Sequence, residues 1–487
     1  MIKRTYKDAI NALNSLQSNF ATIEAARLTA GAKNAVLIPE MIEWTRRIGY
    51  KPQDLNRLNV IHVTGTKGKG STCAFATSIL NQYRSPVQVP GAKITKIGLY
   101  TSPHLKSVRE RLIINGKPIS EALFTKYFFD IWDRLNSTSS DLDKFPNMGP
   151  GVKPAYFRFL TLLSFHAFSS ENVDTAVYEV GVGGEYDSTN IFESPTACGI
   201  TSLGIDHIAV LGNTLEQIAW NKAGIFKPGA ACFSVEQPEE ALNVIKQRAV
   251  EKKVASFEVV EQRPDLAEVK LGINGDFQRQ NASLAVQLVK AHLEKLGVEI
   301  GACDVLPEEF VTGLEQASWP GRCQIIKDDK REDLTWYIDG SHTTESIASG
   351  TAWFASVTND TNRKVLLFNQ QTRNVESLLE ELHLQMQKSG KKFDNVIFST
   401  NVTFSDGKYS DDLVSINVSQ EKVDTMEMQK QMADIWNKFS KESRKHLFHD
   451  IQTSVNFIRT LEGPLDVLVC GSLHLVGGFL LVLDSSK

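Results

Sequence analysis

A glycine-rich loop between an apolar strand and a helix is the feature that most constrains how this chain can fold. Residues 60–63, Val-Ile-His-Val, form an apolar β-branched run typical of a buried strand, and Ser71–Tyr83 has the pattern of a helix. The loop between them reads Gly65-Thr66-Lys67-Gly68-Lys69-Gly70. Glycines let the backbone wrap an anion with its N–H groups, and the start of the helix adds partial positive charge. The pattern predicts a phosphate loop in an α/β protein.

Four residues of this loop are predicted to contact ATP: Gly68, Lys69, Gly70 and Ser71. Lys69 is long enough to reach the β- and γ-phosphates, and Ser71 offers a hydroxyl nearby. The loop departs from the common GxxxxGK(S/T) form, because Gly70 stands between Lys69 and the first hydroxyl. A glycine-rich turn with incidental lysines is the alternative interpretation.

Apolar runs that alternate with helical patterns continue along the chain and predict mostly parallel sheets with crossover connections. Further strands are expected at Asp174–Val180, Ala197–Leu203, Trp336–Ile338, Val365–Phe368, Val396–Phe398 and Val467–Cys470. The Pro-Gly pair at Ser318–Gly321 breaks regular structure, and a fresh alternation follows it. We therefore predict an α/β fold with a P-loop-containing N-terminal domain, residues 1–317, and a smaller Rossmann-like domain, residues 318–487.

Composition narrows the class of protein. The chain has 487 residues, 42% hydrophobic and 23% charged, and a net charge of −4, which argues against nucleic-acid binding through a basic surface. Its six cysteines are scattered without metal-site spacing and fit a reducing compartment. The first residues lack a secretory apolar core, and no run approaches the roughly 20 apolar residues that span a bilayer. We expect a cytoplasmic monomer, and a mitochondrial form would need a start upstream of Met1. Residues 85–96, 136–152 and 405–444 are expected to be polar surface segments.

Several further motifs follow the phosphate loop in a fixed order. They are Tyr100–Leu105 (YTSPHL), Arg109–Arg111 (RER), Phe157–Thr161 (FRFLT), Glu179–Asn190 (EVGVGGEYDSTN), Gly204–His207 (GIDH), Asn221–Lys227 (NKAGIFK), Pro320–Arg322 (PGR) and Asp339–His342 (DGSH). This ordered set resembles the Mur ligase superfamily and, within it, the folylpolyglutamate synthases. The resemblance runs from about residue 58 to 345. Ile114–Ser120 and Phe157–Thr161 are closest to eukaryotic members.

The resemblance implies an ATP-dependent ligase that joins L-glutamate to the γ-carboxylate of a reduced folate through an acyl phosphate. The expected partners are small molecules only: reduced folates, L-glutamate and ATP. Dihydrofolate synthase, which acts on dihydropteroate, is the nearest alternative, and a peptidoglycan-precursor ligase is a second. A P-loop NTPase that drives a switch is the alternative from a different class.

The resemblance also implies a metal site. Its ligands would be Ser102, Glu179, His207 and, if it is carbamylated, Lys222. The expected ion is Mg²⁺, which prefers hard oxygen ligands, and a monovalent cation is expected as a second bound ion. Three of these residues also have an alternative role without a metal. Glu179 could be a solvated strand-end carboxylate, His207 a loop histidine, and Lys222 a phosphate-binding or surface lysine.

Other site residues follow from the same resemblance. Asn281, Arg322 and Asp339 match ATP-binding positions, and an Asn281 that only caps a helix is the alternative. His342 is expected to help bind glutamate or phosphate, and it joins Lys69, Glu179, His207 and Lys222 in the predicted catalytic set. The expected folate-binding residues are His104, Arg109, Arg111, Asp187 and Asn190. Surface salt bridges are the alternative for the arginines.

Overall fold

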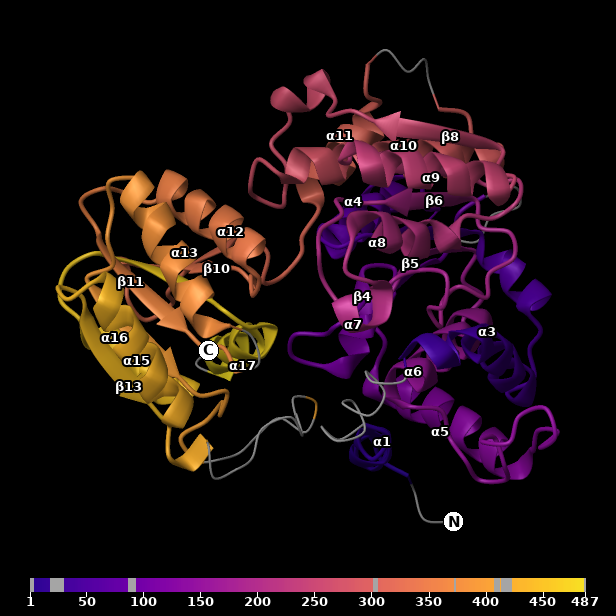
Figure 1. The fold of residues 1–487 in the computed structure, drawn as a ribbon, viewed down its shortest axis with the longest axis horizontal. Coiled ribbons are helices and arrows are strands. Elements are labelled where there is room, and N and C mark those ends of the chain that lie inside the picture. Colours follow the sequence, from indigo (N-terminus) through magenta and orange to yellow (C-terminus); the bar gives the residue numbers. More distant parts are fainter. Residues whose placement is uncertain are drawn as a thin grey trace. The chain divides into compact units, whose positions relative to one another are not determined.

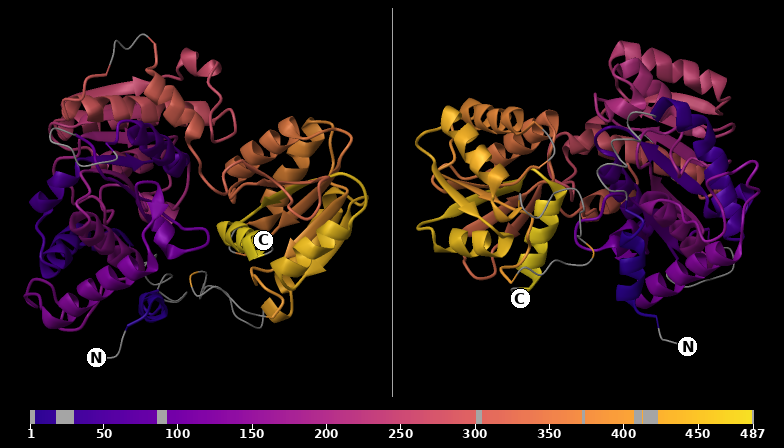
Figure 2. Two further views of the ribbon diagram at one scale, coloured as in Figure 1. Left: turned by 180° about the vertical axis from the view of Figure 1, so that it is seen from behind. Right: turned by 60° about the horizontal axis from the view of Figure 1, so that its bottom comes forward.

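The computed structural model describes residues 4–17, 30–85, 93–300, 305–371, 374–406, 412 and 423–485. The chain forms two compact units. The first consists of Met1–Pro103, Arg109–Gly272 and Gln278–Ser318, and the second of His104–Val108, Ile273–Phe277 and Trp319–Lys487. Each unit is a sheet with helices on both of its faces (Figure 1), and further views of each appear in Figure 2.

The first unit contains an eight-stranded sheet with the order β4-β3-β2-β5-β1-β6-β7-β8. Its strands are β1 (Val60–Thr64), β2 (Ile97–Tyr100), β3 (Leu112–Ile114), β4 (Lys117–Pro118), β5 (Thr175–Glu179), β6 (Ala197–Ile200), β7 (Ala231–Val235) and β8 (Ser256–Val260). Neighbouring strands are parallel from β2 through β8, whereas β3 and β4 form an antiparallel edge. Parallel strands bring their carboxyl ends to one edge of the sheet, where ligands of α/β proteins bind.

Helices cover both faces of this sheet. They are α1 (Tyr6–Asn14), α3 (Ala30–Arg47), α4 (Lys69–Gln82), α5 (Glu121–Ser137), α6 (Tyr156–Ser170), α7 (Ile208–Leu211), α8 (Leu215–Lys222), α9 (Glu239–Glu251), α10 (Gln278–Lys295) and α11 (Glu308–Gln316), with short 3-10 turns at Pro52–Leu58, Val108–Arg111, Ala223–Ile225 and Pro264–Ala267. Strand β6 illustrates the layering, because alternate residues of a strand face opposite sides. Cys198 shares a buried cluster with residues of α8 and α9, while a side chain at Gly199 would meet Leu288 of α10.

The second unit contains a six-stranded sheet with the order β13-β12-β11-β14-β10-β9. Its elements are β9 (Gln324–Lys327), β10 (Leu334–Ile338), α12 (Thr344–Val357), β11 (Arg363–Phe368), α13 (Val375–Lys388), β12 (Asn395–Ser399), α15 (Glu427–Phe439), β13 (Arg444–Phe448), α16 (Ile451–Thr460), β14 (Leu465–Cys470) and α17 (Leu473–Ser485). Only β9 pairs antiparallel. Leu366 packs with α12, α13 and α15, and the next residue, Leu367, packs with α16 and α17 on the other face.

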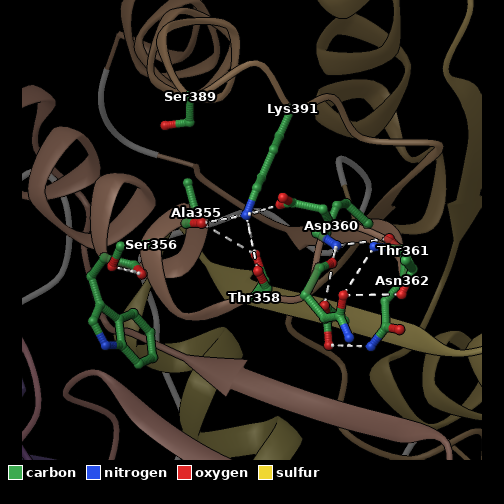
Figure 3. Close-up of polar contacts among 12 residues, drawn as sticks. Ala355, Ser356, Thr358, Asp360, Thr361, Asn362, Ser389 and Lys391 are labelled. Atoms are coloured by element: carbon green, nitrogen blue, oxygen red, sulfur yellow. Dashed lines mark hydrogen bonds and ion pairs between the residues drawn. The ribbon is translucent and has the colours of Figure 1, made fainter.

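A lysine side chain caps the C-terminal end of α12, the first crossover helix of this unit (Figure 3). The ammonium of Lys391 donates to the main-chain oxygens of Ala355 and Thr358, at 2.6 and 2.9 Å, where α12 ends. It also contacts the carboxylate of Asp360 at 2.9 Å. The last carbonyls of a helix have no partner within the helix, so a half-buried cation there satisfies them and complements the helix dipole.

The predicted fold class is confirmed, with local corrections. Helix α4 begins at Lys69 rather than Ser71, and β6 ends at Ile200 rather than Leu203. Part of the predicted polar segments lies outside the described residues. Within the last of them, α15 is a helix with an exposed polar face, as expected, but its Met432 and Trp436 are buried in the core. No helix in the described ranges is both long enough and apolar enough to cross a membrane.

Candidate active site

The phosphate loop has a backbone that only glycine can form at two positions. Gly65 has φ +150° and Gly68 has φ +90°, and Gly68 is the N-cap of α4. A Cβ at Gly65 would lie 1.8 Å from Thr201 Oγ1, and one at Gly68 would lie 2.2 Å from Asn281 Oδ1. Both contacts are far below the van der Waals limit, so the loop is closely packed against β6 and α10. This geometry confirms a glycine-dependent turn between strand and helix.

Two lysine ammonium groups converge inside this turn. Lys69 Nζ donates to the carbonyl oxygen of Gly65 at 3.1 Å, and Lys222 Nζ donates to the same oxygen at 2.7 Å. Lys222 ends α8 and is only 4% exposed. Burial holds the pKa of Lys222 well below its usual range, and repulsion from Lys69 adds to this decrease. Two cations held this close favour a bound anion between them.

A small pocket opens at this point, at the carboxyl ends of β1, β5 and β6. It is lined by Gly65, Thr66, Lys69, Gly181, Val182, Gly183, Asp206, His207, Leu211 and Lys222. His207 has φ +53°, a left-handed conformation that costs free energy for a residue other than glycine and occurs often at functional sites. Its N–H donates to Asp206 Oδ1 at 2.9 Å. Three of the predicted site residues, Lys69, His207 and Lys222, thus line one pocket.

Glu179 lies beside the phosphate loop at the end of β5, paired with Val63 on the neighbouring strand. It is 5% exposed, and its Oε2 accepts the N–H of Ser102 at 2.9 Å. Burial raises the pKa of the Cys73 thiol on α4, and the negative charge of Glu179 adds to that rise. The carboxylate is therefore close to the start of α4.

Glu179 and Ser102 suit Mg²⁺ by their chemistry, because a carboxylate and a hydroxyl are hard oxygen ligands. Across the described residues, no three His, Cys, Asp or Glu side chains are grouped as a ready metal site. A cation bound here would therefore complete its shell with water or substrate oxygens, as Mg²⁺ commonly does.

Two predicted folate-binding residues instead shape the glycine-rich loop after β5. Asp187 Oδ2 accepts the N–H of Val182 at 3.0 Å, and its Oδ1 accepts the N–H and hydroxyl of Thr189 at 2.9 and 2.6 Å. Asn190 Nδ2 donates to the carbonyls of Glu185 and Gly224 at 3.0 and 3.1 Å. Both side chains are buried. These contacts give them a role in holding the loop that lines the pocket.

The other predicted folate-binding residues lie in different surroundings. Arg109 donates to the carbonyl of Ile119 at 3.1 Å, and its guanidinium lies over the ring of Tyr6. Arg111 is buried, with its guanidinium over the ring of Tyr156. His104 belongs to the second unit, where its Nε2 is 2.9 Å from the carbonyl oxygen of Asp412. His104 therefore belongs to a different unit from the other four predicted folate-binding residues.

The second unit brings together Arg322, Asp339 and His342 near the end of β10. The two oxygens of Asp339 accept the N–H groups of Cys323 and Ser341, each at 2.9 Å. A Cβ at Gly340 would lie 2.2 Å from Arg322 Nη1, so the guanidinium lies against this glycine. His342 Nδ1 is 2.8 Å from the carbonyl oxygen of Gly340 and donates to it, which fixes Nε2 as the acceptor nitrogen.

Asn281 is buried near the start of α10, with its amide oxygen against Gly68 and its Nδ2 donating to Gln278 Oε1 at 2.9 Å. Sequence reasoning missed Thr66, Asp206 and Leu211 as pocket residues. For Asp206 a signal existed, since it precedes His207 in a motif that carried the resemblance. For Leu211 no local signal existed, because an apolar residue on a short helix is indistinguishable from core.

Comparison with known proteins identifies the family. Folylpolyglutamate synthase of Saccharomyces cerevisiae strain S288c is 52% identical over 495 residues, covering 99% of this chain and 88% of the relative. The chain belongs to the folylpolyglutamate synthase family. The sequence of another yeast strain, YJM789, matches the chain with the same identity and coverage. The resemblance to eukaryotic folylpolyglutamate synthases is therefore confirmed. No protein-family profile matches the chain.

Solved structures of folylpolyglutamate synthases share the fold. Mycobacterium tuberculosis folylpolyglutamate synthase complexed with ADP has a TM-score of 0.70 at 20% identity, covering 98% of this chain and 99% of that one. The Thermotoga maritima enzyme has a TM-score of 0.66 at 24% identity, covering 91% and 94%. Escherichia coli FolC in complex with DHPP and ADP has a TM-score of 0.65 at 22% identity, covering 91% and 93%.

Proposed function

We propose that this chain is an ATP-dependent ligase that joins L-glutamate to the γ-carboxylate of a folyl-(poly)glutamate. The convergence of Lys69 and Lys222 on the Gly65 carbonyl carries the proposal, since it provides a cationic site for a polyphosphate. The family supports folate and glutamate as the substrates. Dihydropteroate, the acceptor in the alternative activity of a dihydrofolate synthase, must be tested beside folate.

In the proposed reaction, an oxygen of the folate γ-carboxylate attacks the γ-phosphorus of ATP, and the bond from that phosphorus to the bridging oxygen of ADP breaks. The amine of glutamate then attacks the acyl carbon, the bond from carbon to the phosphate oxygen breaks, and the amine loses a proton. The residues act mainly by positioning and by neutralising charge. Lys69 and Lys222 would turn from Gly65 to the phosphate oxygens, and the start of α4 would present its N–H groups.

Glu179 and Ser102 would hold Mg²⁺, which supplies charge neutralisation on the phosphates when it is bound. His207 is proposed as a further ligand, and a monovalent cation as a further bound ion. A carbamylated Lys222 would be anionic, and it would then bind the metal instead of contacting phosphate as a cation. The low pKa of Lys222 favours a neutral amine, the form that reacts with carbon dioxide. Carbon-13 NMR of active protein in labelled bicarbonate that finds no carbamate signal would rule out the carbamate.

We also propose roles for the other predicted site residues. Asn281, Arg322 and Asp339 would bind the nucleotide, and His342 glutamate or phosphate. His104, Arg109 and Arg111 remain candidates for binding the anionic folate tail. Asp187 and Asn190 would affect that binding indirectly, by holding the loop after β5 in shape. We further propose domains at 1–317 and 318–487, a monomer, and a cytoplasmic location with a mitochondrial form as a second one. The free, buried state of the described cysteines, Cys73, Cys198, Cys232, Cys323 and Cys470, fits a reducing compartment.

The test is phosphate release from Mg-ATP with tetrahydrofolate alone, with L-glutamate alone and with both, together with the mass of the folate product. Release only with both, and products that grow by successive glutamyl units, are expected. Dihydropteroate as the only productive acceptor would transfer the assignment to dihydrofolate synthase. Turnover that ignores every acceptor would leave an NTPase. Lys69→Met serves as the inactive control.

A further inference from the structure

Gln237 lies outside the pocket, in the short connection between β7 and α9, and it belongs to none of the sequence motifs described above. Its side-chain amide bridges two residues of the segment after β6. Gln237 Nε2 donates to the carbonyl oxygen of Thr201 at 3.0 Å, and the N–H of Leu203 donates to Gln237 Oε1 at 3.0 Å. The amide therefore binds the main chain on both sides of Ser202, as a neighbouring strand would.

The orientation of this amide is fixed by its partners. Nε2 also donates to Ser234 Oγ at 3.3 Å, and that hydroxyl itself donates to the carbonyl of Val235 at 2.8 Å, so it accepts from Gln237. Both donor hydrogens and the acceptor oxygen are thus used. A flipped amide would set its oxygen against two acceptors, Thr201 O and Ser234 Oγ, and its NH2 group against one donor, the N–H of Leu203. Pro238 follows Gln237 and restricts its backbone to an extended conformation, which limits where the side chain can lie.

The residue between the two bridged positions holds the phosphate loop. The carbonyl oxygen of Ser202 accepts the N–H of Thr66 at 2.9 Å and the N–H of Lys67 at 3.1 Å. Two bonds to one oxygen make the position of that carbonyl decisive for the loop. Because a peptide group is planar, fixing Thr201 and Leu203 fixes the direction of the Ser202 carbonyl between them.

The same segment continues into the pocket. Thr66 Oγ1 donates to the carbonyl of Gly204 at 3.1 Å and accepts its N–H at 3.1 Å. Asp206 and His207 follow directly and line the pocket. A displacement of the segment would therefore move both the phosphate loop and the pocket wall that carries His207.

We propose that Gln237 is a positioning residue for nucleotide binding, which acts by clamping the Thr201–Leu203 segment so that the Ser202 carbonyl holds the phosphate loop in its binding conformation. The proposal rests on the proposed use of ATP. Gln237 touches no reacting atom; it acts through Ser202, Thr66 and Lys67. Among the residues that the structure describes, no other side chain makes hydrogen bonds to the main chain of both Thr201 and Leu203.

Two variants test the clamp. Gln237→Met keeps the length and volume of the side chain but removes both bonds. Gln237→Glu keeps an acceptor for Leu203 but sets a carboxylate against the Thr201 carbonyl. The matched control is Gln452→Met in the second unit, because Gln452 is also half-buried and also binds loop main chain, accepting the N–H of Ser405 at 3.1 Å.

We would measure ADP affinity with a fluorescent ADP analogue, the KM for Mg-ATP and kcat, and hydrogen–deuterium exchange of peptides covering residues 64–70 and 201–207. Both Gln237 variants are expected to bind ADP about tenfold more weakly, with a matching rise in KM and a smaller change in kcat. Exchange should accelerate in those two peptides and stay unchanged elsewhere. Gln452→Met should leave all of these values near those of the wild type.

ADP affinity within twofold of the wild type, with unchanged exchange in both peptides, would overturn the inference. Exchange that accelerates throughout the first unit would also overturn it, because it would show a general stabilising role. If the wild type itself does not bind ADP, the proposed function fails, and the exchange of residues 64–70 still decides whether Gln237 positions the loop. Gln237→Glu provides the reading if Gln237→Met does not fold.

Discussion

Lys69 and Lys222 share one hydrogen-bond acceptor, the carbonyl oxygen of Gly65, although 153 positions separate them in the sequence. Without a bound anion, the two ammonium groups repel each other in a partly dry site. Burial and this repulsion together lower the pKa of Lys222. The protein therefore holds an arrangement that is unfavourable alone and becomes favourable when a polyphosphate enters.

Lys69→Met tests this arrangement through stability. Removal of one cation should stabilise the nucleotide-free protein by about 1 kcal/mol, a rise in Tm of roughly 2–4 °C for units of this size. The same variant should lose the rise in Tm that Mg-ATP gives the wild type. Thermal unfolding with and without Mg-ATP measures both effects. An unchanged response to Mg-ATP would contradict a phosphate role for Lys69.

Glu179→Gln separates metal binding from nucleotide binding. The amide oxygen of glutamine can still accept the N–H of Ser102, which Glu179 now accepts at 2.9 Å, so the fold should be kept. Loss of the negative charge should lower kcat by roughly 100-fold or more, the scale of losing one charge-stabilising group. ADP affinity in the presence of EDTA should not change. Full activity in Glu179→Gln would exclude it as a metal ligand.

The phosphate loop could be predicted from sequence because its signal is local. An apolar strand, glycines and a lysine lie within a dozen residues, and each has its own physical reason. The role of Lys222 could be inferred only from the family resemblance, since its contact with Gly65 depends on how α8 packs against the end of β1. Gln237 carried no signal at all, because a glutamine beside a proline is ordinary in a loop.

Three of the strands that the sequence did not predict, β4, β9 and β13, lie at sheet edges. Strand β13 reads Arg444-Lys-His-Leu-Phe and β9 reads Gln-Ile-Ile-Lys327, with charges on strands at the sheet edges. Charged residues on edge strands protect against aggregation and also hide the apolar pattern. Strand β4 has two residues, too few for any periodicity. The buried interior strands β5 and β14 were predicted, whereas the buried interior strands β2 and β7 were not.

Lys391→Met should destabilise the second unit. It removes the cation that satisfies the last carbonyls of α12, those of Ala355 and Thr358, as Figure 3 shows. Leaving them without that donor should cost about 2 kcal/mol. The control is the adjacent Lys392→Met, because Lys392 pairs with Glu442 at the surface and exposed pairs contribute little, roughly 0–1 kcal/mol. Urea unfolding compares the two, and an equal loss in both would contradict the capping role.

His292 predicts a dependence of stability on pH. It is completely buried, with Nδ1 2.7 Å from Thr196 Oγ1 and Nε2 3.3 Å from Thr175 Oγ1. Thr196 donates its hydroxyl hydrogen to the carbonyl of Val60, so it accepts from His292, whose ring is neutral. Burial lowers the pKa of His292 to about 3 from the usual 6.5.

The unfolded chain therefore binds a proton near pH 6.5 that the folded protein accepts only near pH 3. The stabilisation from a neutral His292 is fully present above pH 6.5 and is lost as pH falls toward 3. Between pH 6.5 and 5.0 this loss should be roughly 2 kcal/mol for this one group. His292→Gln, which can still donate and accept hydrogen bonds, should remove that share of the pH dependence. Urea unfolding at pH 7.5 and 5.0 measures it, with His449→Gln at an exposed histidine as the control. An identical pH dependence in His292→Gln and the wild type would show that His292 is not buried as a neutral ring.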